Sequence, residues 1–196
     1  MPRLRSTGTR QFLGIAGAPG TGKPTFAASL ADMLGRKRTA IVPMDGFHPA
    51  TEVIEGTPLR DRKGAIDTFD IGGYLSLLGR LRARDEPVVY APYYRRGLEE
   101  PIAASIAVAW EIDFVITEGN YLLSPLAPWH RIRSLVDKIW FVDTSHPLRI
   151  ERLIARHIAF GMERETAIAW ALGPDETNAR YVESTRHLAD RQSEGD

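Results

Sequence analysis

The chain contains four short apolar runs, and each of them meets turn or polar residues at its C-terminal end. The runs span residues 12–17, 39–44, 112–117 and 139–144. Runs of this length and composition are typical of strands that are buried on both faces of a sheet. The sequence therefore predicts a mostly parallel sheet.

Helical patterns lie between these runs, with apolar residues recurring at the intervals of a buried helix face. Gly35 is placed to end the first helix, Asp70 to cap the second, and Pro147 to begin a third that runs to Gly161. The side chains expected to face inward are Phe26, Leu30, Met33, Leu34, Ile71, Leu75, Leu78, Ile150, Leu153, Ile154 and Ile158. Strands that alternate with helices predict an α/β fold of three layers, with a mostly parallel central sheet flanked by helices.

Two long segments, residues 46–69 and 87–101, fit neither pattern. Because both are rich in aromatic and charged residues, we predict that they are functional loops. A chain of 196 residues with 43% hydrophobic content is long enough for one sizeable core. We expect a single domain over residues 11–191, preceded by a flexible segment at 1–10 and followed by a frayed tail at 192–196.

Composition narrows the classes of function. Lysine and arginine together number 25, as do aspartate and glutamate, so no overall field draws the protein to nucleic acid or to an acidic membrane. The absence of cysteine excludes disulfides, thiolate metal sites and cysteine nucleophiles. No run approaches the ~18 apolar residues of a membrane span. We expect a cytoplasmic protein that binds neither nucleic acid nor membrane, and the sequence does not indicate its oligomeric state.

Residues 17–23 read GAPGTGK and join a predicted strand to a predicted helix, which is the context of a phosphate-binding P-loop. Glycines let backbone N–H groups converge on phosphate oxygens, and the helix N-terminus and a lysine add positive charge. A glycine-rich turn that binds nothing is the alternative, but the flanking elements favour ATP binding. The predicted nucleotide-binding residues are Gly17, Ala18, Pro19, Gly20, Thr21, Gly22, Lys23 and Thr25.

The position after Lys23 departs from this motif. A P-loop normally has Ser or Thr there to hold Mg²⁺, whereas this chain has Pro24, which offers neither a hydroxyl nor an N–H. We expect Mg²⁺ to be held mainly by the nucleotide, by water and by acidic residues, with Thr25 and Glu118 as candidate protein ligands. The alternative is a nucleotide-binding relative that has lost efficient catalysis.

Asp45 is the candidate general base. It follows the second predicted strand, at the carboxyl edge of the sheet beside the P-loop, where a carboxylate can accept a proton from an attacking hydroxyl. The alternative for Asp45 is a local turn at the end of a strand. His48 is a candidate acceptor-binding residue, although a packed or solvated side chain fits its position equally well.

Five segments occur in a fixed order along the chain: GAPGTGK at 17–23, DGFH at 45–48, RKGAIDTFD at 62–70, YAPYY at 90–94 and TEGNY at 117–121. Together they resemble the uridine kinase and bacterial pantothenate kinase group of P-loop proteins, and the resemblance covers nearly the whole chain after residue 10. The likeness is nearer to a bacterial nucleoside/nucleotide kinase-like branch that is labelled fructose transport system kinase. The resemblance implies the P-loop NTPase fold and a kinase activity.

The resemblance also implies roles for single residues. Asp45 matches the catalytic aspartate of the group, and Lys63 lies in its acceptor-binding segment. Glu118 matches an acidic position near the phosphates and the metal, and it too leaves a buried strand at the carboxyl edge of the sheet. The other acceptor contacts are expected among Arg60, Arg62 and Tyr93.

Three arginines, at positions 149, 152 and 156, share one face of the predicted helix within a lid near 147–161. We expect Arg149 to lie on a solvated face, whereas Arg152 and Arg156 match the lid of the related kinases and are candidates for stabilising the transferred phosphoryl group. Trp170 is expected in the core rather than against an adenine. The predicted activity is transfer of a phosphoryl group from ATP to a hydroxyl of a small sugar, nucleoside or pantothenate-like acceptor. The alternative is a nucleotide-binding regulatory protein.

Overall fold

The computed structural model describes residues 8–194, and strands alternate with helices through most of this range. Most of the predicted flexible segment at 1–10 and the last two residues of the predicted tail lie outside the described residues. No helix in the described range is long and apolar enough to cross a membrane.

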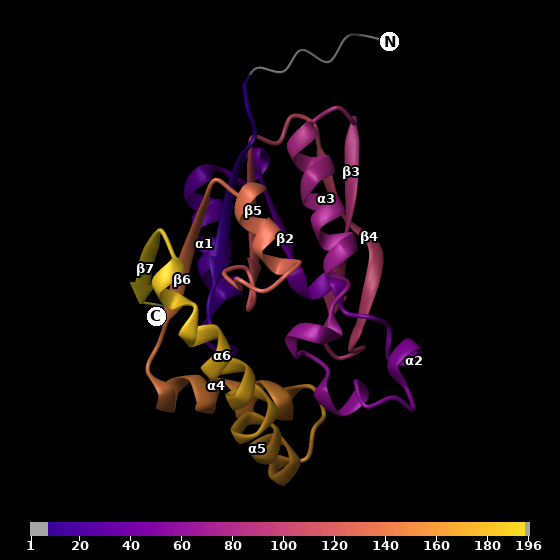
Figure 1. Ribbon diagram of the computed structural model, residues 1–196, viewed down its shortest axis with the longest axis vertical. Coiled ribbons are helices and arrows are strands. Elements are labelled where there is room, and N and C mark those ends of the chain that lie inside the picture. The colour runs from indigo at the N-terminus through magenta and orange to yellow at the C-terminus, as the bar shows by residue number, and fades with distance from the viewer. Residues whose placement is uncertain (1–7, 195–196) are drawn as a thin grey trace.

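Five parallel strands form the central sheet, in the order β2-β5-β1-β6-β7. They are β1 (Gln11–Ala16), β2 (Thr39–Pro43), β5 (Phe114–Gly119), β6 (Lys138–Asp143) and β7 (Arg191–Glu194). Four of them overlap the four apolar runs, which confirms the predicted parallel sheet. In Figure 1 these strands run from top to bottom, so their carboxyl ends meet the helices gathered at the bottom.

Two helices cover the two faces of this sheet. α1 (Lys23–Leu34) packs its buried Ala27 and Ala31 against Ile15 of β1 on one face. α3 (Ile71–Ala83) belongs to the larger core on the other face, which includes Phe12 and Ala16 of the same strand. Because successive side chains of a strand point to opposite faces, one strand supplies both cores. The predicted three-layer arrangement is confirmed.

Two predicted helix boundaries are also confirmed, one at Gly35 and one at Asp70. Gly35 ends α1 with a φ of +90°, and the Asp70 carboxylate caps α3 by accepting a 2.8 Å hydrogen bond from the Gly73 backbone N–H. Met33 was expected to pack inward but is 83% exposed. The helix presents its small Ala27 and Ala31 to the sheet, and Met33 lies two residues beyond Ala31 on the opposite side.

The segment predicted as a loop at 87–101 is a β-hairpin. Strands β3 (Val88–Arg95) and β4 (Glu100–Ala109) pair antiparallel in a separate two-stranded sheet. Val89, Ala91 and Val108 belong to the main core, so the hairpin packs through one face. The loop prediction is wrong because burial alternates along β3, whereas the tyrosines and arginines at its exposed positions make the sequence resemble a loop.

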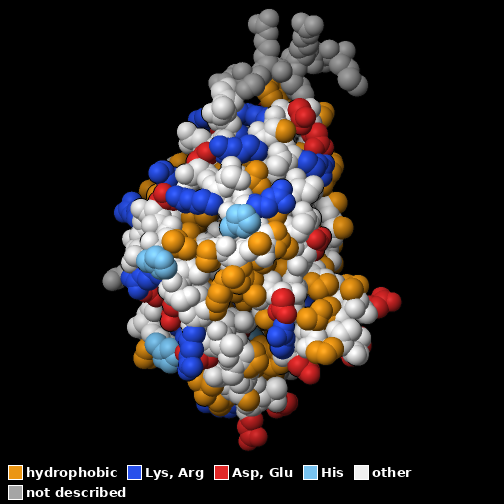
Figure 2. Space-filling view, in the orientation of Figure 1, with side chains coloured by type: hydrophobic (Ala, Val, Ile, Leu, Met, Phe, Trp, Pro, Cys, Tyr) orange, Lys and Arg blue, Asp and Glu red, His pale blue; other side chains and the backbone are white. Residues whose placement is uncertain are grey.

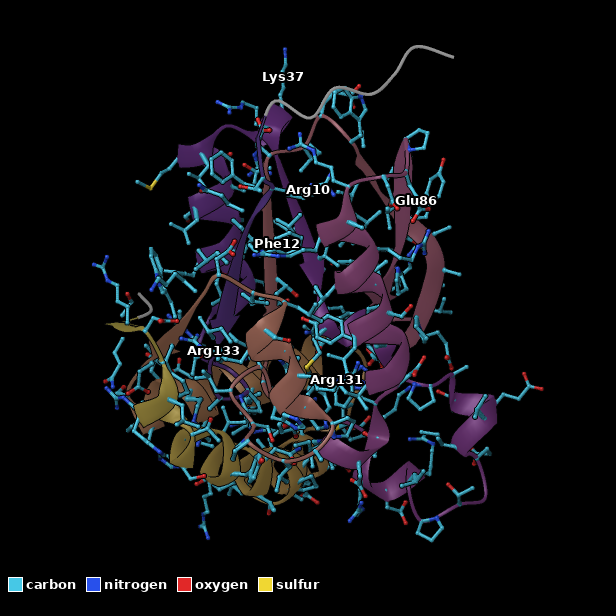
Figure 3. The ribbon with its side chains drawn as sticks, turned by 45° about the horizontal axis from the view of Figure 1, so that its top comes forward. Arg10, Phe12, Lys37, Glu86, Arg131 and Arg133 are labelled. Carbon is cyan, nitrogen blue, oxygen red and sulfur yellow. The ribbon has the colours of Figure 1, made fainter. Side chains whose placement is uncertain are left out.

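The ends of the domain are more ordered than predicted. Arg10 is 4% exposed, and its guanidinium donates to the carbonyl oxygens of Leu81, at 2.7 Å, and Ile112, at 2.9 Å (Figure 3). It therefore ties β1 to the end of α3, and the flexible segment does not reach residue 10. Residues 192–194 are not a frayed tail but part of β7, since the edge of β6 offers them backbone hydrogen-bond partners.

A cluster of helices closes the carboxyl end of the sheet (Figure 1). The helices are α2 (Thr51–Ile54), α4 (His146–Ala159), α5 (Arg164–Leu172) and α6 (Pro174–Ser184). In α4, Leu153 is fully buried as predicted, whereas Ile158, which was expected to face inward, is 38% exposed near the C-terminal end of the helix. These helices and the hairpin surround the ends of β1, β2 and β5.

Candidate active site

A cavity of about 620 Å³ opens at the carboxyl ends of β1, β2 and β5. Its walls come from the P-loop, the strand ends, the segment after β2, the turn of the hairpin and the helices α4 to α6. The charged residues that line it are Lys23, Asp45, Arg60, Lys63, Arg96, Glu99, Glu118, Arg152, Arg156 and Asp175. The fold thus brings most of the predicted site residues to one place.

The P-loop is fixed by its own packing. Gly20 and Gly22 both have a φ of +87°, a conformation that favours glycine. A Cβ on Gly17 would lie 2.4 Å from the carbonyl oxygen of Val142, so no larger residue fits between the loop and β6. Thr21 is buried and its hydroxyl donates to the Ala18 carbonyl at 2.9 Å. The loop is therefore held open as a backbone cradle before any phosphate arrives.

Lys23 lies within this cradle. Its ammonium donates to the carbonyl oxygens of Gly17, at 2.8 Å, and Ala18, at 2.9 Å, and to Oδ1 of Asn120 at 2.8 Å. Burial lowers the pKa of Lys23 to about 8, although the carboxylates of Glu118 and Asp45 raise it in part. The lysine therefore remains mostly charged at neutral pH, beside the expected phosphates.

Two carboxylates stand at neighbouring strand ends. Glu118 pairs in register with Pro43 at the end of β2, and Asp45 follows two residues later. Glu118 is 5% exposed, and burial, with repulsion from Asp45, raises its pKa to about 7. Burial also acts to raise the pKa of Asp45, but the positive charges of His48, Arg96, Lys23 and Arg156 outweigh it and bring that pKa below its ordinary value. Asp45 is thus the ionised partner of the pair.

The side of the cavity where the sequence predicted acceptor contacts is aromatic and basic. His48 lines it and packs between two tilted rings, Phe69, with ring centroids 4.1 Å apart, and Tyr94, at 4.9 Å. Burial lowers the pKa of His48, which favours the neutral ring. Lys63 also lines the cavity, donating to the Thr51 hydroxyl at 3.1 Å and holding its ammonium 5.4 Å from the Tyr94 ring centroid. Both residues lie where the sequence predicted acceptor contacts.

Helix α4, the predicted lid, contributes two arginines to the same cavity, Arg152 and Arg156. Nη1 of Arg152 is buried without a hydrogen-bond partner among the described residues, and it would lie 3.5 Å from a Cβ placed on Gly22 of the P-loop. A buried guanidinium N–H without an acceptor is costly unless a ligand supplies one. This arrangement fits a bound anion such as the phosphates of ATP.

Arg149 has a different position from the one predicted. It is 1% exposed rather than solvated, because its guanidinium forms an ion pair with Glu176 of α6.

Trp170, predicted in the core, is half-buried and lines the cavity. Its face toward the cavity is open because α5 buries the alanines Ala167 and Ala171 instead.

Six predicted site residues do not line the main cavity, and three of them lie outside the P-loop. Thr25 is exposed on α1 and Arg62 is exposed in an ion pair with Asp67; neither lines the cavity. Tyr93 is 46% exposed and lines a smaller neighbouring cavity of about 320 Å³, together with Pro24. Among the P-loop residues, Gly17, Ala18 and Thr21 set the shape of the loop rather than line the cavity.

Two of the polar residues that sequence reasoning did not single out lie next to Lys23 and Asp45. Asn120 follows β5 within the recognised TEGNY segment, so its closeness to the P-loop could have been inferred from the strand ends. Arg96 places Nη2 3.2 Å from Oδ2 of Asp45. Arg96 lies in the segment 87–101 that was predicted to be functional, but it was not singled out because the hairpin that carries it to Asp45 was not predicted.

Comparisons with known proteins agree with this geometry, although no family model matches the chain. The chain is 32% identical over 184 residues to "Putative uridine kinase C227.14" of Schizosaccharomyces pombe, with 89% of this chain and 78% of that protein covered. It is 28% identical to a pantothenate kinase of Mesorhizobium japonicum, with 94% of this chain and 59% of that protein covered.

A solved structure gives the same result. The crystal structure described as a "putative fructose transport system kinase" from Silicibacter sp. TM1040 superposes with a TM-score of 0.86 at 33% identity, and the match covers 98% of this chain and 92% of that one. The resemblance predicted from the ordered motifs is confirmed. The chain belongs to the uridine kinase and pantothenate kinase-like group of P-loop kinases.

Proposed function

We propose that this protein transfers the terminal phosphoryl group of ATP to a hydroxyl group of a small metabolite. One observation carries the proposal: Lys23, which is buried, and Arg152, whose buried Nη1 has no hydrogen-bond partner among the described residues, both lie at the P-loop in the cavity that also holds two carboxylates at adjacent strand ends. Phosphoryl transfer needs cations around the migrating group and an acceptor for the hydroxyl proton. This cavity supplies both.

Each residue has a distinct role in this reaction. The P-loop backbone and Lys23 hold the β- and γ-phosphates. Asp45 accepts the hydroxyl proton as the acceptor oxygen forms a bond to the γ-phosphorus, while the bond to the bridging oxygen breaks and ADP leaves. Arg152 and Arg156 neutralise the charge on the transferred group. Since the pKa of Asp45 lies below its ordinary value, it is ionised and ready to accept a proton at neutral pH.

Mg²⁺ fits this site through the Glu118 carboxylate rather than through the hydroxyl expected in a P-loop. Asp45 and Glu118 line the same cavity, whereas Thr25 is exposed and points away from it. Oxygen ligands of this kind suit Mg²⁺, which commonly keeps several waters. When bound with ATP, the metal neutralises phosphate charge. Glu118 is the residue that we assign to holding it, directly or through water.

A turnover assay with an acceptor panel tests the proposal. ATP consumption is measured with sugars, nucleosides and pantothenate, each against a control without acceptor. We expect ATP consumption to depend on one class of acceptor. ATP binding without acceptor-dependent consumption across the panel would instead support a regulatory protein, the alternative that the replacement of a P-loop hydroxyl by Pro24 keeps open.

The partner is a small molecule rather than a nucleic acid in this proposal. The formal net charge is +0, and acidic and basic side chains both occur across the face in Figure 2. Nucleic-acid-binding proteins concentrate positive charge in a patch or stripe. The basic side chains to which we assign a function line the cavity.

A further inference from the structure

Arg96 reaches the candidate base from a distant part of the chain. It lies in the turn between β3 and β4, yet Nη2 is 3.2 Å from Oδ2 of Asp45. Its side chain lines both the main cavity and the smaller one beside it. The guanidinium is therefore at the junction of the two cavities, on the acceptor side of the carboxylate.

The turn that carries Arg96 is firmly held. The Glu99 carboxylate accepts hydrogen bonds from the Gly97 backbone N–H, at 2.9 Å, and from the Tyr94 hydroxyl, at 3.0 Å. Lys63 donates to the Glu99 carbonyl at 2.8 Å. The backbone of the turn is thus anchored to Lys63, whereas the Arg96 side chain is 35% exposed and makes one ion pair among the residues that the structure describes.

This ion pair conflicts with the role of Asp45 as a base. One carboxylate oxygen faces Arg96, so an acceptor hydroxyl must compete with a guanidinium for it. Partly exposed ion pairs are weak and are readily exchanged. A carboxylate or phosphate on the acceptor can replace Asp45 as the partner of Arg96, because a guanidinium binds such groups through two parallel hydrogen bonds. A neutral acceptor offers Arg96 no such replacement.

We propose that Arg96 selects the acceptor: it pairs with Asp45 in the empty site and binds an anionic group of the incoming acceptor, which leaves the carboxylate free to take the hydroxyl proton. The acceptor class is then a hydroxy compound that carries a carboxylate or a phosphate. The release of Asp45 to act as a base depends on the proposed kinase function. The recognition of an anionic acceptor by Arg96 does not.

The test compares acceptor binding to the wild-type protein, Arg96→Gln, Arg96→Lys and the matched control Arg95→Gln. Arg95 is the exposed neighbour at the end of β3 and lines neither cavity. Calorimetry with a non-hydrolysable ATP analogue measures the affinity for pantothenate, glycerate and glycerol phosphate as anionic compounds and for uridine as a neutral one. We expect Arg96→Gln to weaken the binding of the anionic acceptor at least tenfold, with partial recovery in Arg96→Lys and no change in Arg95→Gln or in nucleotide affinity.

Other outcomes contradict the inference. Equal affinity in the wild type and Arg96→Gln, binding of uridine alone, or failure of every anionic compound to bind the wild type would each overturn it. The kinase function is judged separately by turnover. If the anion binds through Arg96 but no ATP is consumed, the kinase proposal fails and the recognition stands. If uridine is phosphorylated and Arg96 has no effect on its KM, the kinase proposal stands and the recognition fails.

Discussion

The ammonium of Lys23 is held by three oxygen acceptors and shielded from water. Burial lowers its pKa to about 8, against the opposing effect of Glu118 and Asp45. A phosphate bound in the P-loop adds negative charge beside this ammonium, so ATP binding favours its charged form. Lys23 is therefore the cation that holds the phosphates and also a group whose own charge depends on them.

We predict that Lys23→Met weakens ATP binding about 10- to 100-fold, because a hydrogen bond to a charged group contributes about 1.5–3 kcal/mol. Calorimetric titration of ATP measures the loss. Lys37→Met is the control, because Lys37 is exposed at the opposite end of the molecule, labelled at the top of Figure 3. Equal ATP affinity in both variants would remove Lys23 from the binding site.

The raised pKa of Glu118 predicts that the free energy of unfolding depends on pH. Its pKa is raised by burial from 4.5 to about 7, so the folded protein binds a proton that the unfolded chain releases. The contribution of this group is fully present below pH 4.5 and is lost as the pH rises through about 7. Glu118→Gln removes the titration, and its free energy of unfolding should rise relative to the wild type by on the order of 2 kcal/mol between pH 5 and pH 8.

Urea unfolding of both proteins at the two pH values measures this difference. A difference between variant and wild type that is the same at pH 5 and pH 8 would show that Glu118 does not titrate as a buried acid.

Replacement of Pro24 tests how the proposed Mg²⁺ is held. Because Asp45 and Glu118 line the cavity and Thr25 does not, we expect a hydroxyl at position 24 to be unnecessary. Pro24→Ser should change MgATP affinity and turnover by less than about threefold, which corresponds to under 1 kcal/mol. A tenfold or larger gain in turnover would mean that the proline had impaired the site.

At the scale of elements, the lid rests on an ion pair between two helices. Arg149 of α4 is buried against Glu176 of α6, and a Cβ on Gly20 of the P-loop would lie 2.7 Å from the Arg149 carbonyl oxygen. The start of α4 is therefore packed directly on the P-loop. This contact positions the part of the lid that carries Arg152 and Arg156.

Glu176→Ala should lower the free energy of unfolding by on the order of 3 kcal/mol, because it leaves the Arg149 guanidinium buried without its main counter-ion. Glu151→Ala, at an exposed position on α4, is the matched control. Chemical denaturation measures both. A loss in Glu176→Ala no larger than in the control would mean that the ion pair does not hold the lid.

Elements with a clear hydrophobic pattern of their own were predictable from the sequence. Elements that form only against a tertiary partner were not. The four core strands are continuous apolar runs, so their burial was evident. The hairpin was missed because its exposed face carries tyrosines and arginines that resemble a loop. Strand β7 was missed because four polar residues form it only against the edge of β6.

The candidate site follows the same division. Lys23, Asp45 and Glu118 come directly from strand ends, and the topology of a parallel sheet places such ends together. Arg96 depends on how a hairpin folds back over the sheet, and the burial of Arg149 depends on a partner 27 residues away. Thr25 was misplaced because the sequence alone does not show which positions in the first turn of α1 face the cavity, and the Thr25 side chain is exposed.

At the scale of the whole molecule, three parts of the chain surround one cavity. The sheet with its P-loop supplies Lys23 and the carboxylates, the hairpin with the acceptor segment supplies Arg96 and Lys63, and the lid supplies Arg152 and Arg156. The central claim is that their meeting point performs phosphoryl transfer.

Comparison of the wild type with Asp45→Asn tests that claim most directly. On the acceptor that gives the highest rate, the account predicts a fall in kcat of about 10²- to 10⁴-fold, the range expected for loss of a general base, with little change in the affinity for ATP. A variant that turns over as fast as the wild type would contradict it.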